Sequence, residues 1–322
     1  MRHVFLLLIL LLFIVHGVSA QAKRPFFRPD TTLNKTKVWI AGGSTVGIYT
    51  GALVVLNEYW YKGYPRSRFH FFNDSKEWMG IDKCGHIYSS YVESRWATGI
   101  FRWTGMKERQ AIWIGGMTGA FLQTSIEILD GFSEKWGFSG YDILANTAGS
   151  MMVIGQELAW KEQRITLKIS AFPQSYPDDL RPRAKDLFGN TAVELFLKDY
   201  NAITTWASVS IGSFIKKPTK FPKWICVSVG YGANGLYGGF ENRWCKDSNT
   251  DVLDCDPANV VDRTDVRRYP QFYLSMDVDF TKIKTRSPVL KSLFNVINVI
   301  KVPFPAVEFN PVDKVKVHPI FF

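Results

Sequence analysis

The chain has 322 residues, of which 46% are hydrophobic and 15% aromatic, and its formal net charge at pH 7 is +10. This length suffices for one large or two modest domains. The positive charge suits an anionic membrane surface, and the export signal described next argues against nucleic acid as a partner.

The N-terminus has the pattern of a secretory signal. A short basic start precedes the apolar residues 4–15, and small residues at 17–20 form a cleavage site, so residues 1–20 are predicted to be a signal peptide. There is no lipobox cysteine, and we therefore expect no lipid anchor. Residues 21–37 are basic and aperiodic, which predicts an extended leader.

Residues 38–56 form a run of nineteen residues without charge and contain Gly43, Gly47 and Gly51. Such a run either spans a bilayer or forms a buried helix whose glycines admit a close neighbour. We favour the packed helix. The segment 59–72 interleaves aromatic residues with cations, as at a membrane interface or in an aromatic loop packed on a domain surface, and here we favour the interface.

Helical patterns follow at about 78–103, 109–130 and 140–160. Together with 38–56 they predict a mainly α fold: a four-helix membrane-associated bundle (38–160), followed by a β-containing C-terminal part. The charges of the loops do not follow the positive-inside rule. We therefore expect the periplasmic side of the cell envelope, with association with the outer membrane, rather than a multi-pass inner-membrane protein.

After the helices the composition changes. Residues 161–202 are polar, contain three prolines and predict a linker region. Residues 203–322 are predicted to be β-rich, with strand-like runs at 204–214, 224–233 and 271–280 and a helical pattern at 289–300.

Four cysteines lie beyond the signal peptide. In an oxidising compartment Cys245 and Cys255 either close a short disulfide loop or remain free thiols. Cys84 lacks a nearby second cysteine, which favours a small buried hydrophobe over a nucleophile. The acidic residues 247–251 resemble the start of a calcium loop, but Val252 and Ala258 replace its glycine and glutamate, so we expect a solvated turn.

Ionisable residues gather within the helical patterns. Asp82 and His86 are four residues apart, and Glu127 and Asp130 are three apart, so each pair shares a helix face. Glu127 and Asp130 lie in the last turn before Gly131, where the helix dipole disfavours negative charge. We therefore expect compensation by Lys83, by a protonated His86 or by a bound metal.

The order Asp82-Lys83-x-x-His86, Glu127-x-x-Asp130 and Gly137-Phe138-Ser139-x-x-Asp142-x-x-x-Asn146-x-x-Gly149 resembles the YfiM-like domain of unknown function, a family described as predicted periplasmic lipoproteins. The resemblance covers roughly residues 78–155. The same order is loosely similar to VanZ-like membrane proteins. The chain departs from the lipoprotein members in lacking the lipobox cysteine, and the family implies no established activity.

Two interpretations of the cluster stay open. In the functional one, His86, Glu127, Asp130, Asp82 and Asp142 form a catalytic or ligand site. His86, Glu127 and Asp130 would hold a divalent metal, and His86 or Glu127 would activate water. In the structural one, the same groups form a polar network between helices, and Ser139-x-x-Asp142 only caps the fourth helix.

The function predicted from the sequence is that of an exported cell-envelope protein with a structural or lipid-headgroup-binding role. The alternative is a membrane-surface hydrolase or other metal-dependent enzyme. Membrane lipids are the expected partners, and the sequence indicates no particular protein partner.

Overall fold

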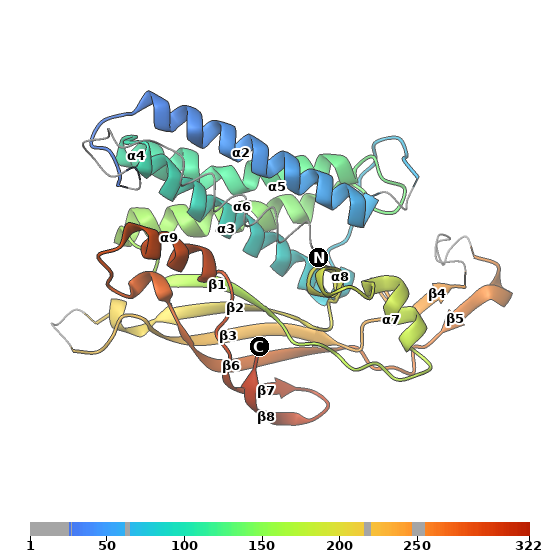
Figure 1. The fold of residues 1–322 in the computed structure, drawn as a ribbon. Coiled ribbons are helices and arrows are strands. Elements are labelled where there is room, and N and C mark those ends of the chain that lie inside the picture. Colours follow the sequence, from blue (N-terminus) through green and yellow to red (C-terminus); the bar gives the residue numbers. More distant parts are fainter. Residues whose placement is uncertain (1–25, 27, 62–64, 216–219, 247–254) are drawn as a thin grey trace.

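The computed structural model describes residues 26, 28–61, 65–215, 220–246 and 255–322. Its first half is a layer of helices, which Figure 1 shows above the sheet. In chain order, the helices of this layer and the π-helical turns between them are α2 (Lys35–Leu56), a π turn (Asn57–Tyr61), α3 (Ile81–Trp103), α4 (Glu108–Gln110), a second π turn (Ala111–Gly115), α5 (Gly116–Asp130) and α6 (Gly140–Trp160).

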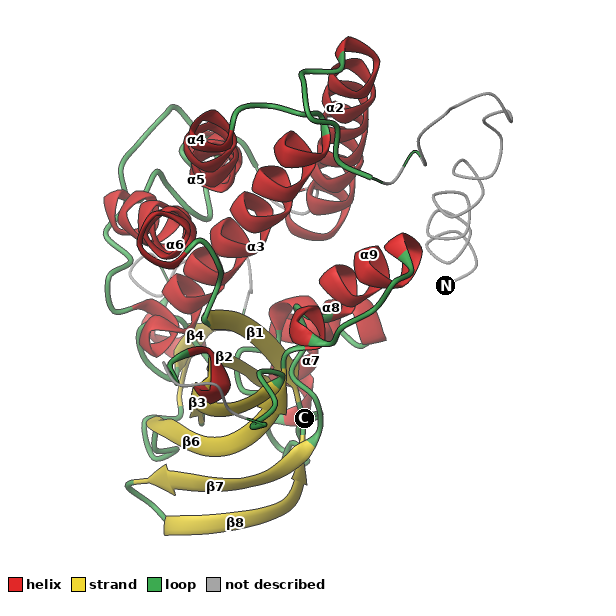
Figure 2. Cartoon of the chain, turned by 90° about the vertical axis from the view of Figure 1, so that its left-hand side faces the viewer, coloured by secondary structure: helices red, strands yellow, loops and turns green. Residues whose placement is uncertain are grey.

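The second half contains a sheet and three further helices: β1 (Ile165–Ala171), α7 (Arg181–Phe188), α8 (Ala192–Lys198), β2 (Ile203–Ser210), β3 (Ile225–Asn234), β4 (Arg243–Cys245), β5 (Val260–Asp262), β6 (Tyr269–Val278), α9 (Pro288–Ile297), β7 (Phe304–Asn310) and β8 (Lys314–Phe321). Six strands form one antiparallel sheet in the order β1-β2-β3-β6-β7-β8, and β4 pairs with β5. Figure 2 shows that the large sheet is strongly curved.

The predicted fold class, a mainly α four-helix membrane-associated bundle, is wrong. The second half of the chain forms a six-stranded sheet, and β1 lies within the segment expected to be a linker. The strand-like runs near 204–214, 224–233 and 271–280 correspond to β2, β3 and β6. The strands β1, β7 and β8 were missed. Both β7 and β8 contain a proline, a residue that usually argues against a strand.

The helices α3, α5 and α6 pack closely because small residues line their contacts. A Cβ on Gly119 would lie 2.1 Å from the carbonyl oxygen of Ser90, and one on Gly149 would lie 2.2 Å from that of Ile87. Buried serines join the same helices: the Ser150 hydroxyl lies 2.8 Å from that of Ser94 and accepts from the backbone N–H of Ala120 at 2.9 Å. Gly119 and Gly149 therefore allow α5 and α6 to approach α3 closely.

The core of the protein lies between α3 and the sheet. Ile81 at the start of α3 packs on Ile203, Ala233 and Leu236. Nearly three helical turns further along α3, Tyr91 and its neighbours pack on Leu167 of β1. Because α3 is held by α5 and α6 on one side and by β1, β2 and β3 on the other, its position fixes the geometry of every residue on it.

The helix α2 lies at the outside of the layer. Among the described residues it is the one helix long and apolar enough to cross a membrane, judged by length and composition, with a mean hydropathy of 1.5. Trp39 is 81% exposed, and a Cβ on Gly43, Gly47 or Gly51 would meet nothing within 4 Å. The expectation that this segment is a packed helix with an interfacial glycine stripe is therefore wrong.

Of the two alternatives for Cys245 and Cys255, the structure has the disulfide, with an S–S distance of 2.04 Å. Cys84 is a half-buried free thiol. Burial raises its pKa to about 11, so the thiol stays protonated and is a poor nucleophile. The predicted signal peptide and the acidic residues 247–251 lie outside the described residues.

Candidate functional site

The site begins at an unusual turn before α3. Trp78, Met79 and Gly80 have φ angles of 48°, 52° and 78°, a run of left-handed residues that is costly for the two that carry a Cβ. Two contacts with the second half of the chain hold this turn. The backbone N–H of Trp78 donates to the carbonyl of Gly239 at 2.7 Å, and the Tyr231 hydroxyl donates to the carbonyl of Met79 at 2.6 Å. The turn presents the first residues of α3 to α5 and α6.

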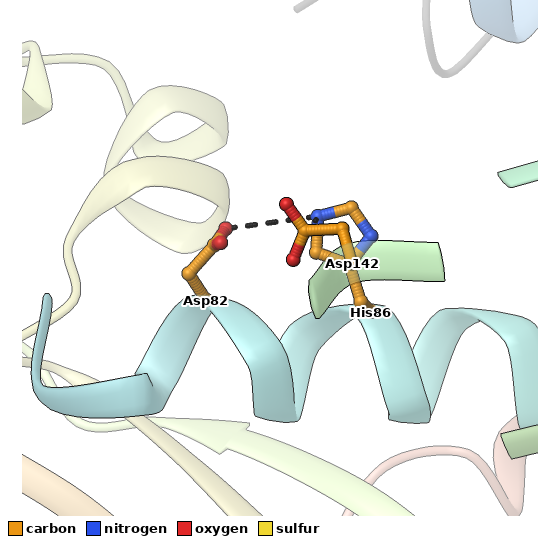
Figure 3. Close-up of side chains that lie close together, drawn as sticks. All are labelled: Asp82, His86 and Asp142. Atoms are coloured by element: carbon orange, nitrogen blue, oxygen red, sulfur yellow. Dashed lines mark ion pairs between the residues drawn. The ribbon is translucent and has the colours of Figure 1, made fainter. Parts of the chain in front are cut away.

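His86 lies one turn further along α3 than Asp82 and faces α6, as Figure 3 shows. Its Nδ1 is 3.1 Å from the Oδ1 of Asn146. Because an amide oxygen only accepts hydrogen bonds, Nδ1 is the donor in this contact, and Nε2 faces the neighbouring carboxylates. Orientation of an imidazole by a hydrogen bond from its other nitrogen is typical of metal-ligating histidines.

Three carboxylates surround this Nε2 atom. It lies 3.8 Å from Oδ1 of Asp82, 3.6 Å from Oε1 of Glu127 and 3.7 Å from Oδ1 of Asp142. Asp82, His86 and Asp142 each offer a ligand atom, and these atoms lie within 4.8 Å of one another. Residues from α3, α5 and α6 thus converge on one point.

Lys83 compensates part of this negative charge. Its Nζ lies 2.6 Å from Asp74, 2.8 Å from Asp82 and 2.6 Å from Asp142. Burial lowers the pKa of Lys83, but these carboxylates outweigh that effect and hold the pKa above its usual value. Lys83 therefore contributes a positive charge to the site and is not a solvated surface lysine.

Asp74, which the sequence analysis missed, lies in the loop before α3. It is 5% exposed, and its Oδ1 accepts a hydrogen bond from the Ser139 hydroxyl at 2.5 Å. Burial raises its pKa, but hydrogen bonds with Asp142, Lys83 and Ser139 leave the pKa below its usual value. No sequence signal identifies Asp74, because the loop has no periodicity that would predict where it folds.

Asp142 takes part both in the helix cap and in the cluster. Its backbone N–H donates to the Ser139 hydroxyl at 3.1 Å, so Ser139 caps α6 as expected. Its carboxylate points away from the cap, toward Lys83 and His86. Burial raises the pKa of Asp142 to about 7.

Glu127 and Asp130 share the end of α5 but differ in their surroundings. Glu127 is 1% exposed, its Oε2 accepts weakly from the Ser139 backbone at 3.4 Å, and its Oε1, aimed at His86, has no hydrogen-bond partner among the described residues. Burial, followed by the charges of Asp142 and Asp130, raises its pKa to about 9.

Asp130 accepts a hydrogen bond from a residue outside the cluster. Its Oδ1 accepts from the Tyr61 hydroxyl at 2.6 Å, and burial raises its pKa to about 6. No ion pair within 4.0 Å joins it to His86 among the described residues. The structure therefore brings together His86, Asp82, Glu127 and Asp142 of the predicted site residues and places Asp130 at the side.

A family comparison covers the same stretch of chain. Residues 70–154 match the model of a family described as "Predicted periplasmic lipoprotein (DUF2279)". No curated protein and no solved structure matches the chain. The match contains every residue of the cluster and supports a protein of unknown function exported to the periplasmic side. The finer likenesses to YfiM and to VanZ remain predictions.

Proposed function

We propose that the exported protein binds one divalent transition-metal ion through His86, Asp82, Glu127 and Asp142. The observation that carries the proposal is the buried Oε1 of Glu127, which has no hydrogen-bond partner among the described residues and lies 3.6 Å from Nε2 of His86. A buried carboxylate oxygen without a partner is costly, and a cation between it and the imidazole removes that cost.

The dimensions and the chemistry of the donors fit such an ion. A metal about 2.0–2.2 Å from each ligand separates ligand atoms by roughly 3.3–3.6 Å in a tetrahedral arrangement. Asp82, His86 and Asp142 already place ligand atoms within 4.8 Å of one another, whereas Glu127, 3.6 Å from Nε2, must move further to join them. One imidazole with three carboxylates suits Zn²⁺ or Mn²⁺. The side chains of His86 and Asp82 are 16% and 21% exposed, so both reach solvent in part.

A structural network is the second candidate, and the three ion pairs of Lys83 favour it. In that case Lys83 and the hydrogen bond from Ser139 to Asp74 join the loop before α3 to α6, and His86 only bonds Asn146. The two candidates differ in whether a metal is present. A hydrolytic role would further require a coordination position open to water, where the ion lowers the pKa of the bound water.

Metal content of the purified full-length protein tests the proposal. We expect near-stoichiometric metal in the wild type after dialysis against Zn²⁺ or Mn²⁺, and loss of that metal in His86→Ala and Glu127→Gln. The matched control is Asp130→Asn, which removes a carboxylate one turn from Glu127 that bonds Tyr61 instead. It should retain the metal. A wild type without metal, or equal retention in all variants, would refute the proposal.

A further inference from the structure

The outer face of the curved sheet is apolar and exposed. In β3, β6, β7 and β8 alternate residues point away from the concave side, and every residue of these four strands is described. None of these outward residues carries a charge. Eight of them are between 37% and 67% exposed: Val227, Val229, Phe272, Leu274, Met276, Phe309, Val315 and Val317.

Strand register makes these side chains one continuous surface. Val229 pairs with Leu274, Leu274 with Val307, and Val307 with Val317. The neighbouring row runs from Phe272 through Phe309 to Val315. Side chains paired in this way lie about 4.5–5.5 Å apart. The surface therefore extends without interruption over four strands, and contiguous apolar surfaces of this kind are rare on soluble monomers.

The concave face of the same sheet is buried and mixes charged with aromatic side chains. Lys168 and Asp277 form an ion pair at 2.9 Å with both side chains 0% exposed. Trp206, Tyr273, Ala306 and Phe321 form a buried cluster on the same side. The apolar outer face continues from Val229 through Ala207 of β2 to Leu167 of β1, where Tyr91 of α3 covers it. Beyond that cover the eight outward residues stay exposed, although a soluble sheet buries its apolar face.

The hydrogen-bonding capacity of this face indicates whether hydrocarbon or a protein covers it. Protein interfaces carry about one hydrogen bond per 100–200 Å². Among the outward residues, Tyr231 has a hydroxyl, but it is already bonded to Met79. The outward side chains therefore offer no free hydrogen-bonding group, which fits hydrocarbon, because hydrocarbon offers none in return.

The ends of the strands fit a bilayer as well. The strands β3 and β6 each have ten residues, and a strand of about 9–11 residues crosses the hydrocarbon layer. Trp224 and Lys223 precede β3, while Arg267 precedes β6 and Lys314 begins β8 at the opposite end. Aromatic and cationic side chains at the strand ends are suited to the headgroup region and to anionic lipids.

We propose that the outer face of β3, β6, β7 and β8 is covered by lipid hydrocarbon of an envelope membrane. The concave face and the metal cluster lie outside the hydrocarbon. This proposal does not depend on the metal, because it concerns a different surface and different residues.

Spin labels test it in vesicles of phosphatidylethanolamine and phosphatidylglycerol. The full chain carries Cys84→Ala and Cys226→Ala, and a single label is placed at Leu274→Cys or Val317→Cys. The control label at Lys185→Cys lies on the exposed surface of α7. We expect labels at 274 and 317 to collide several-fold more often with oxygen, which partitions into hydrocarbon, than with a water-soluble nickel complex. The label at 185 should show the reverse.

Two results would overturn the proposal. Frequent collision of the label at 274 with the nickel complex would mean that water covers the face. Collision with neither reagent would mean that protein covers it, for instance a second copy of this chain. A phospholipid with a photoreactive acyl chain, applied to the unmodified protein, guards against misfolding of the variants. It should label peptides of β6 and β8 and spare those of α7, and the opposite distribution would refute lipid contact.

Discussion

Replacement of Lys83 by methionine tests how strongly the cluster depends on its cation. The ammonium lies within 2.8 Å of Asp74, Asp82 and Asp142, whose side chains are 7%, 21% and 6% exposed. Removal of one partner from a buried ion pair leaves an uncompensated charge and costs about 3–5 kcal/mol. Partial protonation of Asp142, whose pKa is raised to about 7, offsets some of that cost, so we place the loss of unfolding free energy near the lower value.

Thermal melting followed by circular dichroism measures this effect. In the presence of a chelator, so that no metal shares the compensation, Lys83→Met should lower the melting temperature by roughly 5 °C. Lys185→Met on the exposed surface of α7 is the control and should change the unfolding free energy by less than about 0.5 kcal/mol. If Lys83→Met melted within about 2 °C of the wild type, the carboxylates would not depend on this lysine and the charge argument would fail.

Two further predictions concern the helix layer. Burial raises the pKa of Glu93 from 4.5 to about 7, so between these values the folded chain holds a proton that the unfolded chain has released. Stability should therefore fall as pH rises through this window, by at most about 3 kcal/mol. Glu93→Gln should remove that fall in urea unfolding, and an unchanged pH profile would contradict the assignment. Gly149→Ala places a Cβ 2.2 Å from the Ile87 carbonyl and should lower the unfolding free energy by about 1–3 kcal/mol, whereas Gly155→Ala on the same helix meets nothing within 4 Å and should not. Equal urea midpoints for the two variants would refute the packing of α6 on α3.

Local spacing was the part of the site that the sequence could predict. Asp82 and His86 share a face of α3, and Ser139 caps α6 before Asp142, because helical geometry and capping depend on residues a few positions apart. The spacing of Glu127 and Asp130 predicted two equivalent ligands. Only the fold shows that Tyr61 donates a hydrogen bond to Asp130, while Glu127 faces His86.

The fold was harder to predict because both faces of its sheet carry apolar residues. The outward valines and phenylalanines continue the face that α3 covers at β1, and the inward lysines and acids alternate with Trp206 and Tyr273. Such alternation does not tell which face is buried, and Pro305 and Pro319 hid β7 and β8. Both prolines are tolerated near the edge of the sheet, where the pairing of β7 with β8 also contains an irregularity. The exposure of α2 was missed for a related reason, since an uncharged helix with a glycine stripe has the same sequence whether lipid or protein surrounds it.

X-ray absorption at the edge of the bound metal tests the central claim most directly, because it reports which atoms surround the ion. The metal centre predicts one imidazole nitrogen and carboxylate oxygens at about 2.0–2.2 Å, with no sulfur, although Cys84 lies between Asp82 and His86 in the chain. A sulfur ligand near 2.3 Å, or a metal surrounded by water alone, would contradict it.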